Sequence, residues 1–221
     1  MTITKTTKPI EDQAIHSEIL LTMQRMVVEC TNPHVQKFSD GFRDIQEQWR
    51  DVGFKVLPVT RLLNDISPDT RSLAGKLLSQ MIAYRESLFW EQTYTKKDRV
   101  VGDALLSGYA FAEITGQRGP FISDQLRSGV GVWGPNVEYP LHWHDAEEIY
   151  WILSGSVWFQ IGRDQAKSFK KTGGIVFVPS SIPHSFETRE EPLVMFYLWQ
   201  GGDLRQVSEF ERKISQAVHC S

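Results

Sequence analysis

The chain has 221 residues, of which 23% are charged, and its formal net charge is −3. This length fits one or two domains that bury a core without disulfides, and the charge offers no basic surface for nucleic acid or an anionic membrane. Two cysteines exclude a disulfide framework or a cysteine-rich zinc module. There is no run of about 18 apolar residues for a transmembrane helix, and the start of the chain lacks the apolar core of a secretory signal. We therefore expect a cytoplasmic protein.

The first part of the chain shows the periodicity of amphipathic helices. Over residues 10–30, apolar side chains recur at spacings of three and four, which places them on one helical face. The same spacing over residues 35–52 predicts a second helix, which Pro33 can open at its first turn. A third helix is expected to begin at Ser67, a serine cap followed by proline and an acid, with a buried stripe over residues 73–88.

After residue 108 the pattern changes to short runs that are rich in Val, Ile, Phe, Trp and Tyr and separated by turn residues. Runs of this kind occur at residues 129–133, 149–153, 157–161, 175–178 and 193–199. Many short strands at this spacing are typical of an antiparallel sandwich or barrel. Helical spacing returns over residues 203–216.

These patterns divide the chain into three parts. We expect a helical N-terminal region over residues 1–104, a β-barrel over residues 105–202, and a C-terminal helix packed on the barrel over residues 203–221. The expected fold is therefore mainly β with α.

Three of the six histidines lie in the β half of the chain, beside an acid, in a pattern that suggests a metal site. His142 and His144 are separated by one residue, so on a strand both project from the same face. Glu148 follows four residues after His144, and His184 ends a second block that starts at Gly173. Imidazoles and a carboxylate that converge from neighbouring strands would suit Zn, Fe, Mn, Co or Ni. The alternative is that the two closely spaced histidines are solvent-facing polar residues of one strand.

The spacing of these residues resembles the two motifs of the cupin superfamily. In the first, His-x-His-x-x-x-Glu is followed after six residues by Gly155, and in the second, Gly173 and Pro179 precede the last histidine at the expected intervals. Three turn or support positions depart from the motifs, at Gly134, Ser181 and Thr188. The resemblance covers roughly residues 105–200. It implies a double-stranded β-helix barrel, or jelly roll, with four metal ligands: His142, His144, Glu148 and His184.

A longer segment indicates one particular family within this superfamily. Tyr139-Pro-x-His-x-His-x-Ala-Glu-Glu-x-Tyr150, with a helical region ahead of the barrel and Pro183-His184 after it, is similar to the cupin-type dimethylsulfoniopropionate (DMSP) lyases. This resemblance implies a metal-dependent carbon–sulfur lyase that cleaves DMSP to acrylate and dimethyl sulfide by base-promoted β-elimination. It also implies that Tyr150 is the base that takes the α-proton and that Tyr139 lies near the substrate. A metal-bound hydroxide is the alternative base.

The residues themselves favour a place near the metal for Tyr150 and for the last strand. Tyr150 is two residues from Glu148, so both would point to the same side of a strand. A nearby cation would favour the phenolate of this tyrosine, although inward tyrosines more often fill the core. On the final strand, Tyr197 and Trp199 share a face and form a candidate wall for the cationic sulfonium group, because aromatic faces attract cations. The alternative is that these rings are plain barrel core.

Two other classes of function fit the same motifs. One is another metal-dependent cupin enzyme, such as an Fe(II) oxygenase, and the other is a cupin sensor that binds a small molecule without reaction. A DNA-binding regulator is disfavoured, because the predicted N-terminal helices carry acids among their bases, as at residues 47–51. Aromatic residues on the outward faces of the strands suggest a homodimer.

Overall fold

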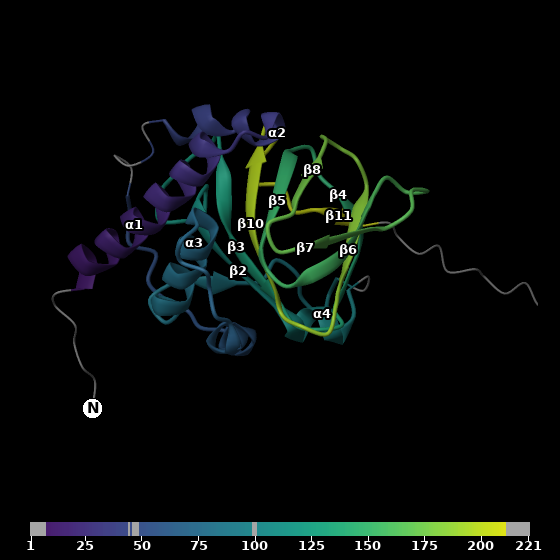
Figure 1. Ribbon diagram of the computed structural model, residues 1–221, viewed down its shortest axis with the longest axis horizontal. Helices are drawn as coiled ribbons and strands as arrows, with labels where there is room; N and C mark the ends of the chain where they lie inside the picture. The colour runs from purple at the N-terminus through teal and green to yellow at the C-terminus, as the bar shows by residue number, and fades with distance from the viewer. Residues whose placement is uncertain (1–7, 44, 46–48, 99–100, 211–221) are drawn as a thin grey trace, which may run out of the picture.

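The computed structural model describes residues 8–43, 45, 49–98 and 101–210. Within them, two antiparallel sheets face each other, and helices cover the outer side of the larger sheet (Figure 1). This arrangement confirms the predicted cupin-type β-sandwich with a helical region before it. None of the described helices combines the length and apolar character needed to span a bilayer.

The strands were largely predictable from the sequence. The large sheet contains, in spatial order, β1 (Trp90–Glu91), β2 (Tyr109–Thr115), β3 (Arg127–Trp133), β10 (Leu193–Gln200), β5 (Glu147–Ser154) and β8 (Ile175–Val178). The small sheet contains β11 (Glu209–Phe210), β4 (Glu138–Trp143), β9 (His184–Thr188), β6 (Ser156–Ile161) and β7 (Ser168–Lys171). All five runs that the sequence analysis marked as strands lie in these elements. The large sheet also takes β1 from the region predicted to be helical.

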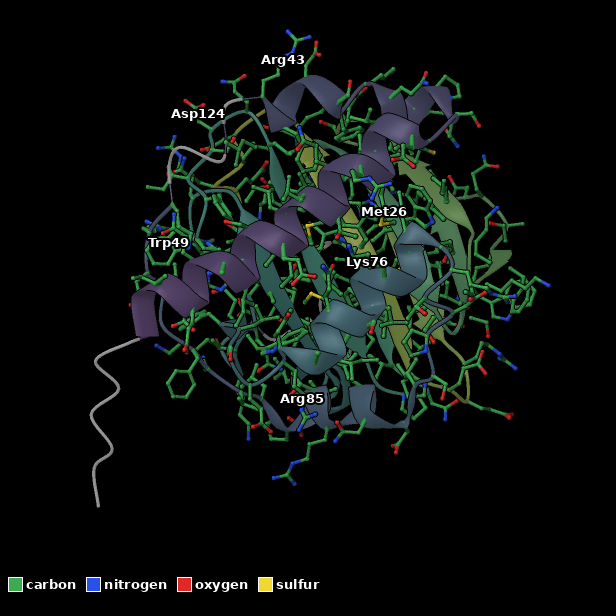
Figure 2. All side chains as sticks on the ribbon, turned by 60° about the vertical axis from the view of Figure 1, so that its left-hand side comes forward. Met26, Arg43, Trp49, Lys76, Arg85 and Asp124 are labelled. Atoms are coloured by element: carbon green, nitrogen blue, oxygen red, sulfur yellow. The ribbon has the colours of Figure 1, made fainter. Side chains whose placement is uncertain are left out.

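The described helices lie before the main strands in the chain. They are α1 (Lys8–Glu29), α2 (Pro33–Gln36), η1 (Ser39–Phe42), η3 (Pro58–Asp65), α3 (Leu73–Ala83) and α4 (Asp103–Gly108), the two η elements being 3₁₀ helices. Figure 2 shows α1 and α3 side by side across the outer face of the large sheet. The first predicted helix is confirmed, since α1 covers nearly all of residues 10–30.

The prediction of one continuous helix over residues 35–52 is wrong. Two short elements, α2 and η1, take its first part, and η1 ends at Phe42. The apolar periodicity reflects burial rather than a helix, because Phe38 and Phe42 both lie in the core. Gly41 lets the chain pass close to its neighbour here, since a Cβ at this position would lie 2.9 Å from the Cβ of Leu126.

The third predicted helix begins later than expected. The cap of α3 is Ser72 rather than Ser67, and the Ser72 hydroxyl accepts a 3.0 Å hydrogen bond from the backbone N–H of Gly75. The chain at Asp69 folds back onto the first turn, where a Cβ on Gly75 would lie 1.8 Å from the Asp69 carbonyl oxygen. The predicted stripe is buried in part, as at Leu77, although the helix itself ends at Ala83.

The C-terminal helix predicted over residues 203–216 is absent from its described part, which ends at Phe210. This part forms turns and then β11, which pairs with the edge strand β4 so that Phe210 lies opposite His142. The Phe210 ring packs 4.8 Å from that of Tyr94. The pairing satisfies backbone groups at an otherwise open sheet edge, which favours an extended segment over a helix. Residues 211–221 lie outside the described residues.

Both faces of the large sheet are buried, and they contribute to two separate clusters of apolar side chains. Toward the helices, Ile149 and Leu153 of β5 join the cluster formed with α1 and α3. Toward the small sheet, Tyr150 and Ile152 join a second cluster that is rich in aromatic rings. Alternation along β5 therefore turns Glu148 and Tyr150 into the space between the sheets.

Candidate active site

Three buried histidines meet where β4 and β9 pair in the small sheet. His142 of β4 lies directly opposite His184 of β9, and His144 follows the end of β4. Their ligand nitrogens all lie within 4.8 Å of one another, and each residue is at most 1% exposed. The structure thus brings together the three histidines that the sequence pattern singled out, and they form a group able to hold a metal ion.

Backbone carbonyl groups fix the orientation of each ring. The Nδ1 atoms of His142, His144 and His184 lie 2.8, 3.0 and 3.0 Å from carbonyl oxygens two residues away. A carbonyl oxygen only accepts, so each Nδ1 carries the proton and each Nε2 keeps a lone pair that is free to bind a metal. Burial, and then the neighbouring His184, lower the pKa of His142 well below its usual value, which favours the neutral form that binds metals.

Glu148 reaches this cluster from the opposite sheet. Its Oε2 atom lies 2.9 Å from Nε2 of His144 and 3.5 Å from Nε2 of His184. Because the Nδ1 protons of both rings are held by carbonyl groups, the neutral imidazoles turn Nε2 lone pairs toward this carboxylate, an arrangement that repels unless a cation lies between them.

These contacts fit a divalent transition metal. Nε2 of His184 is buried without a hydrogen-bond partner, and Nε2 of His144 faces another acceptor, as expected of atoms that share a cation. Metal–ligand bonds of about 2.0–2.2 Å bring neighbouring ligand atoms to about 3 Å from each other, close to both distances of Glu148. A donor set of imidazole nitrogens and one carboxylate suits Zn, Fe, Mn, Co or Ni.

An aromatic cavity lies beside this cluster. Glu148 lines it, together with all four residues that the sequence analysis proposed for catalysis or substrate binding: Tyr139, Tyr150, Tyr197 and Trp199. The lining also includes residues that sequence reasoning missed: Thr93, Tyr94, Tyr109, Phe111, Arg127, Trp133, Gln206, Val207 and Ser208. Aromatic side chains dominate, so the cavity suits a small molecule with an apolar or cationic part.

Tyr150 lies on β5 beside the histidine cluster. Its ring centre is 6.3 Å from that of His184 and 5.3 Å from that of Phe159. Burial, and then the Glu148 carboxylate, raise the pKa of Tyr150 well above its usual value. With these neighbours alone the hydroxyl keeps its proton at neutral pH, and a positive charge nearby is needed to favour the phenolate.

Trp199 is enclosed by two polar neighbours. Its ring stacks on that of His144 at 3.9 Å with an interplanar angle of 27°, and the guanidinium carbon of Arg127 lies 4.7 Å from its centre. Arg127 is buried, and its Nε donates a 2.8 Å hydrogen bond to Glu113. Sequence reasoning found Trp199 but missed Arg127, although an arginine at the start of the otherwise uncharged run RSGVGVW was a usable signal.

Tyr94 was also missed, because it comes from the segment before the barrel. Its hydroxyl accepts a 2.9 Å hydrogen bond from Tyr139, and its backbone N–H donates to the hydroxyl of Tyr109. The three rings pack together with centres 5.9–6.2 Å apart. Polar residues follow Tyr94 in the chain, so only the three-dimensional structure shows its aromatic neighbours.

The sequence matches the dimethylsulfoniopropionate lyase family over residues 36–195, a span that includes the histidine cluster, Glu148 and Tyr150. The chain is 34% identical over 140 residues to the dimethylsulfoniopropionate lyase DddQ of Ruegeria pomeroyi, across 63% of this chain and 68% of that protein. The family match therefore extends from the helical region through both sheets.

Two solved structures are similar to this chain over most of its length. A chain from the crystal structures of the DMSP lyases RdDddP and RnDddQII superposes with a TM-score of 0.78 at 27% identity, covering 91% of this chain and 100% of that one. The DMSP lyase DddQ from Ruegeria pomeroyi DSS-3 gives a TM-score of 0.74 at 26% identity, covering 89% of this chain and 96% of that one. The similarity thus includes N-terminal helices as well as the sandwich.

Proposed function

Because the chain belongs to the dimethylsulfoniopropionate (DMSP) lyase family, we propose that it is a carbon–sulfur lyase that cleaves DMSP to acrylate and dimethyl sulfide. The observation that carries this proposal is the buried cluster of three histidines beside an aromatic cavity. DMSP is a small zwitterion with a carboxylate at one end and a dimethylsulfonium group at the other. A metal site suits the first group, and aromatic rings attract the second.

We propose His142, His144, Glu148 and His184 as the residues that hold a divalent metal. Bound there, such a metal would act as a Lewis acid on the substrate carboxylate and supply positive charge beside Tyr150. The chain itself contributes the orientation of each imidazole through the backbone carbonyl groups, which keeps each Nε2 free to bind the metal.

Tyr150 is the proposed base of the elimination. Its phenolate oxygen takes the α-proton of the substrate, the electron pair of that C–H bond forms the new double bond, and the C–S bond breaks with its electrons on sulfur. Dimethyl sulfide leaves as a neutral molecule and acrylate remains, so no oxidant or reductant is consumed. The place of Tyr150 in the cavity lining, two residues from Glu148 on β5, supports this role.

Tyr139, Tyr197 and Trp199 are the proposed walls of the substrate pocket. All three line the cavity, and the ring of Tyr139 lies 4.5 Å from that of His142. The hydroxyl of Tyr197 is buried without a hydrogen-bond partner, so it is free to donate to an oxygen of a bound substrate. These side chains also fill the space that water would otherwise occupy around the reacting groups.

Headspace dimethyl sulfide from the purified, metal-loaded protein mixed with DMSP tests this function. We expect release that a chelator stops and that Tyr150→Phe lowers by about 10²–10⁴-fold, the usual contribution of a general base, with the metal content unchanged. Tyr84→Phe, which alters a tyrosine bonded to Glu18 away from the cavity, should match the wild type. If the protein releases no dimethyl sulfide with any of the candidate metals, the assignment is wrong, and oxygen uptake would then test for an Fe(II) oxygenase.

We also propose that the enzyme is a cytoplasmic homodimer and that its metal is Zn, Fe, Mn, Co or Ni. Elemental analysis of the protein as purified would identify the metal. Light scattering would measure the mass of the assembly, and the mass of a single chain would refute the dimer.

A further inference from the structure

A charged side chain lines the aromatic cavity without a role in the proposed elimination. Arg127, at the start of β3, is 6% exposed, and its Nε donates a 2.8 Å hydrogen bond to Oε2 of Glu113. Oε1 of Glu113 accepts from the backbone N–H groups of Arg118 and Gly119 at 2.7 and 3.1 Å. Arg127 lines the cavity and Glu113 does not, so the guanidinium is the end of this ion pair that faces a ligand.

Stability alone does not account for a buried ion pair at this place. Taking both charges out of water costs about as much free energy as their attraction returns, or more. The side chains of Arg127 and Glu113 are 7% and 3% exposed, and two apolar side chains of similar size would stabilise the fold at least as well. The positive charge at the cavity wall therefore points to a role in binding.

The guanidinium of Arg127 also lies against the ring of Trp199, one of the two rings that the sequence analysis favoured for binding the cation of the substrate. Trp199 of β10 pairs with Arg127 of β3 on one side and with Glu148 of β5 on the other. The guanidinium carbon lies 4.7 Å from the centre of the indole ring, and the ring of His144 stacks on it at 3.9 Å. Two protein groups thus engage this ring already, and one of them is a cation that repels a second cation.

We propose that Arg127 is a specificity-determining residue that orients a zwitterionic substrate in the cavity, an inference that rests on the proposed function. Its guanidinium makes the Trp199 end of the cavity favourable for an anionic group and unfavourable for a cationic one. The histidine cluster reaches this end through His144, which stacks on Trp199, and it also borders Tyr139, whose ring lies 4.5 Å from that of His142. The carboxylate of the substrate therefore binds here, and the sulfonium group points away.

The tyrosines of the cavity offer a place for that sulfonium group. The rings of Tyr94, Tyr109 and Tyr139 are inclined to one another by 38°, 68° and 81°, so their faces point in different directions. Hydrogen bonds within the protein engage the hydroxyl groups. Rings held in this way attract a cation through their faces and carry no charge of their own.

Binding of two singly charged probes to the metal-loaded, full-length protein tests this orientation. The probes are trimethylsulfonium, which has only the cation, and propionate, which has only the anion, each titrated by calorimetry. In Arg127→Met we expect trimethylsulfonium to bind about tenfold tighter and propionate about tenfold weaker, because a unit charge a few ångströms away has an effect of this order in a partly screened cavity. In Arg127→Lys both affinities should stay near those of the wild type.

Two further variants make the test specific. Arg118→Met removes an arginine that lies 3.7 Å from Glu113 and 5.7 Å from the ring centre of Phe111 but does not line the cavity. Because Arg118 is half-exposed, both affinities should change by less than about twofold. Glu113→Gln leaves the Arg127 guanidinium without its counter-charge, so trimethylsulfonium should bind more weakly and propionate more tightly.

The inference fails if both probes weaken together in Arg127→Met, as general damage to the cavity would cause, or if Arg118→Met reproduces the effect. Should Arg127→Met not fold, Glu113→Gln decides the matter, and affinities that do not move in opposite directions overturn the inference. Probe binding requires no turnover. A wild-type protein that releases no dimethyl sulfide therefore refutes the lyase function. The affinities for the two probes still test whether Arg127 favours an anion over a cation in the cavity.

Discussion

Removing the metal from the cluster of His142, His144 and His184 should lower the melting temperature of the protein. Without a cation, imidazole lone pairs lie close to the Glu148 carboxylate, and Nε2 of His184 stays buried with no hydrogen-bond partner. A bound metal satisfies these groups in the folded state only, because the unfolded chain does not hold the ligands together. Its binding free energy therefore adds to the stability of the fold.

The size of this effect follows from mass action. At a free metal concentration about 100 times the dissociation constant, binding to the folded state adds about 2.7 kcal/mol to the free energy of unfolding. For a chain of 221 residues, each kcal/mol moves the melting temperature by about 2–4 °C. We therefore expect the metal to raise the melting temperature by roughly 5–11 °C, with a further rise at higher metal concentration.

Differential scanning fluorimetry of chelator-treated protein, with and without added Zn²⁺, measures this shift. His184→Ala should lose most of it, because the cluster then lacks one imidazole. His34→Ala removes an exposed histidine that stacks on Phe177 at 4.2 Å, away from the cluster, and should keep the full shift. Equal stabilisation of His184→Ala and the wild type by Zn²⁺ would refute the reasoning, since the cation would then bind elsewhere.

Two further predictions concern the core and the first helix. Phe196→Ala, at a fully buried position between the large sheet and the helices, should lower the free energy of unfolding in urea by about 3–5 kcal/mol, and equal losses at exposed Phe169 would contradict this. Burial lowers the pKa of His16 from 6.5, and its Nδ1 accepts a 3.2 Å hydrogen bond from Trp49. The unfolded chain then binds a proton at His16 more readily than the folded chain does. The contribution of neutral His16 to the free energy of unfolding is therefore complete above pH 6.5 and falls as the pH drops below it. His16→Gln should flatten this slope in thermal melts across pH, and an unchanged slope would exclude His16 as its origin.

Three of the four proposed metal ligands were predictable because their arrangement is local in the chain, and only His184 comes from a distant strand. His142 and His144 share a face through the two-residue period of a strand, and Glu148 follows four residues later as the second residue of β5. The chain crosses between these points from β4 in the small sheet to β5 in the large one, so Glu148 approaches the histidines from the opposite side. The spacing of the motif reflects that crossing between the sheets. The resemblance to cupins was therefore sufficient to predict that these residues lie close together.

Arg127 and Tyr94 were not predictable in this way, because their positions depend on contacts between distant segments. Arg127 meets Trp199 only through the pairing of β3 with β10. Tyr94 bonds to Tyr139 across 45 positions of the chain. Neither contact leaves a periodic pattern, since Arg127 is the first residue of a glycine-containing strand and Tyr94 opens a polar segment.

The predicted helices over residues 35–52 and 203–216, which are absent where the structure describes these segments, show what apolar periodicity does and does not measure. In the described part of residues 35–52 the spacing marked buried side chains at Val35, Phe38, Phe42 and Ile45, yet the chain there forms only the short elements α2 and η1 rather than one helix. Over residues 203–210, Leu204 is buried but Val207 is 49% exposed, which is not the pattern of one helical face. Spacings of three and four therefore do not establish a helix by themselves, because segments that pack against a core in other conformations produce them as well.

The position of Tyr94 explains how the N-terminal region takes part in the site. The cavity lining contains no residue of α1 or α3, which lie outside the large sheet, but it contains Thr93 and Tyr94. β1, directly before them, pairs with β2 and so anchors this segment at the edge of the sheet. The helices pack on the large sheet, and β1 pairs with β2 at the edge of that sheet. This pairing places Tyr94 against Tyr139. A barrel that began at residue 105 would keep the histidines and Tyr150 without the wall that Tyr94 provides, so the proposed metal ligands alone do not form the cavity.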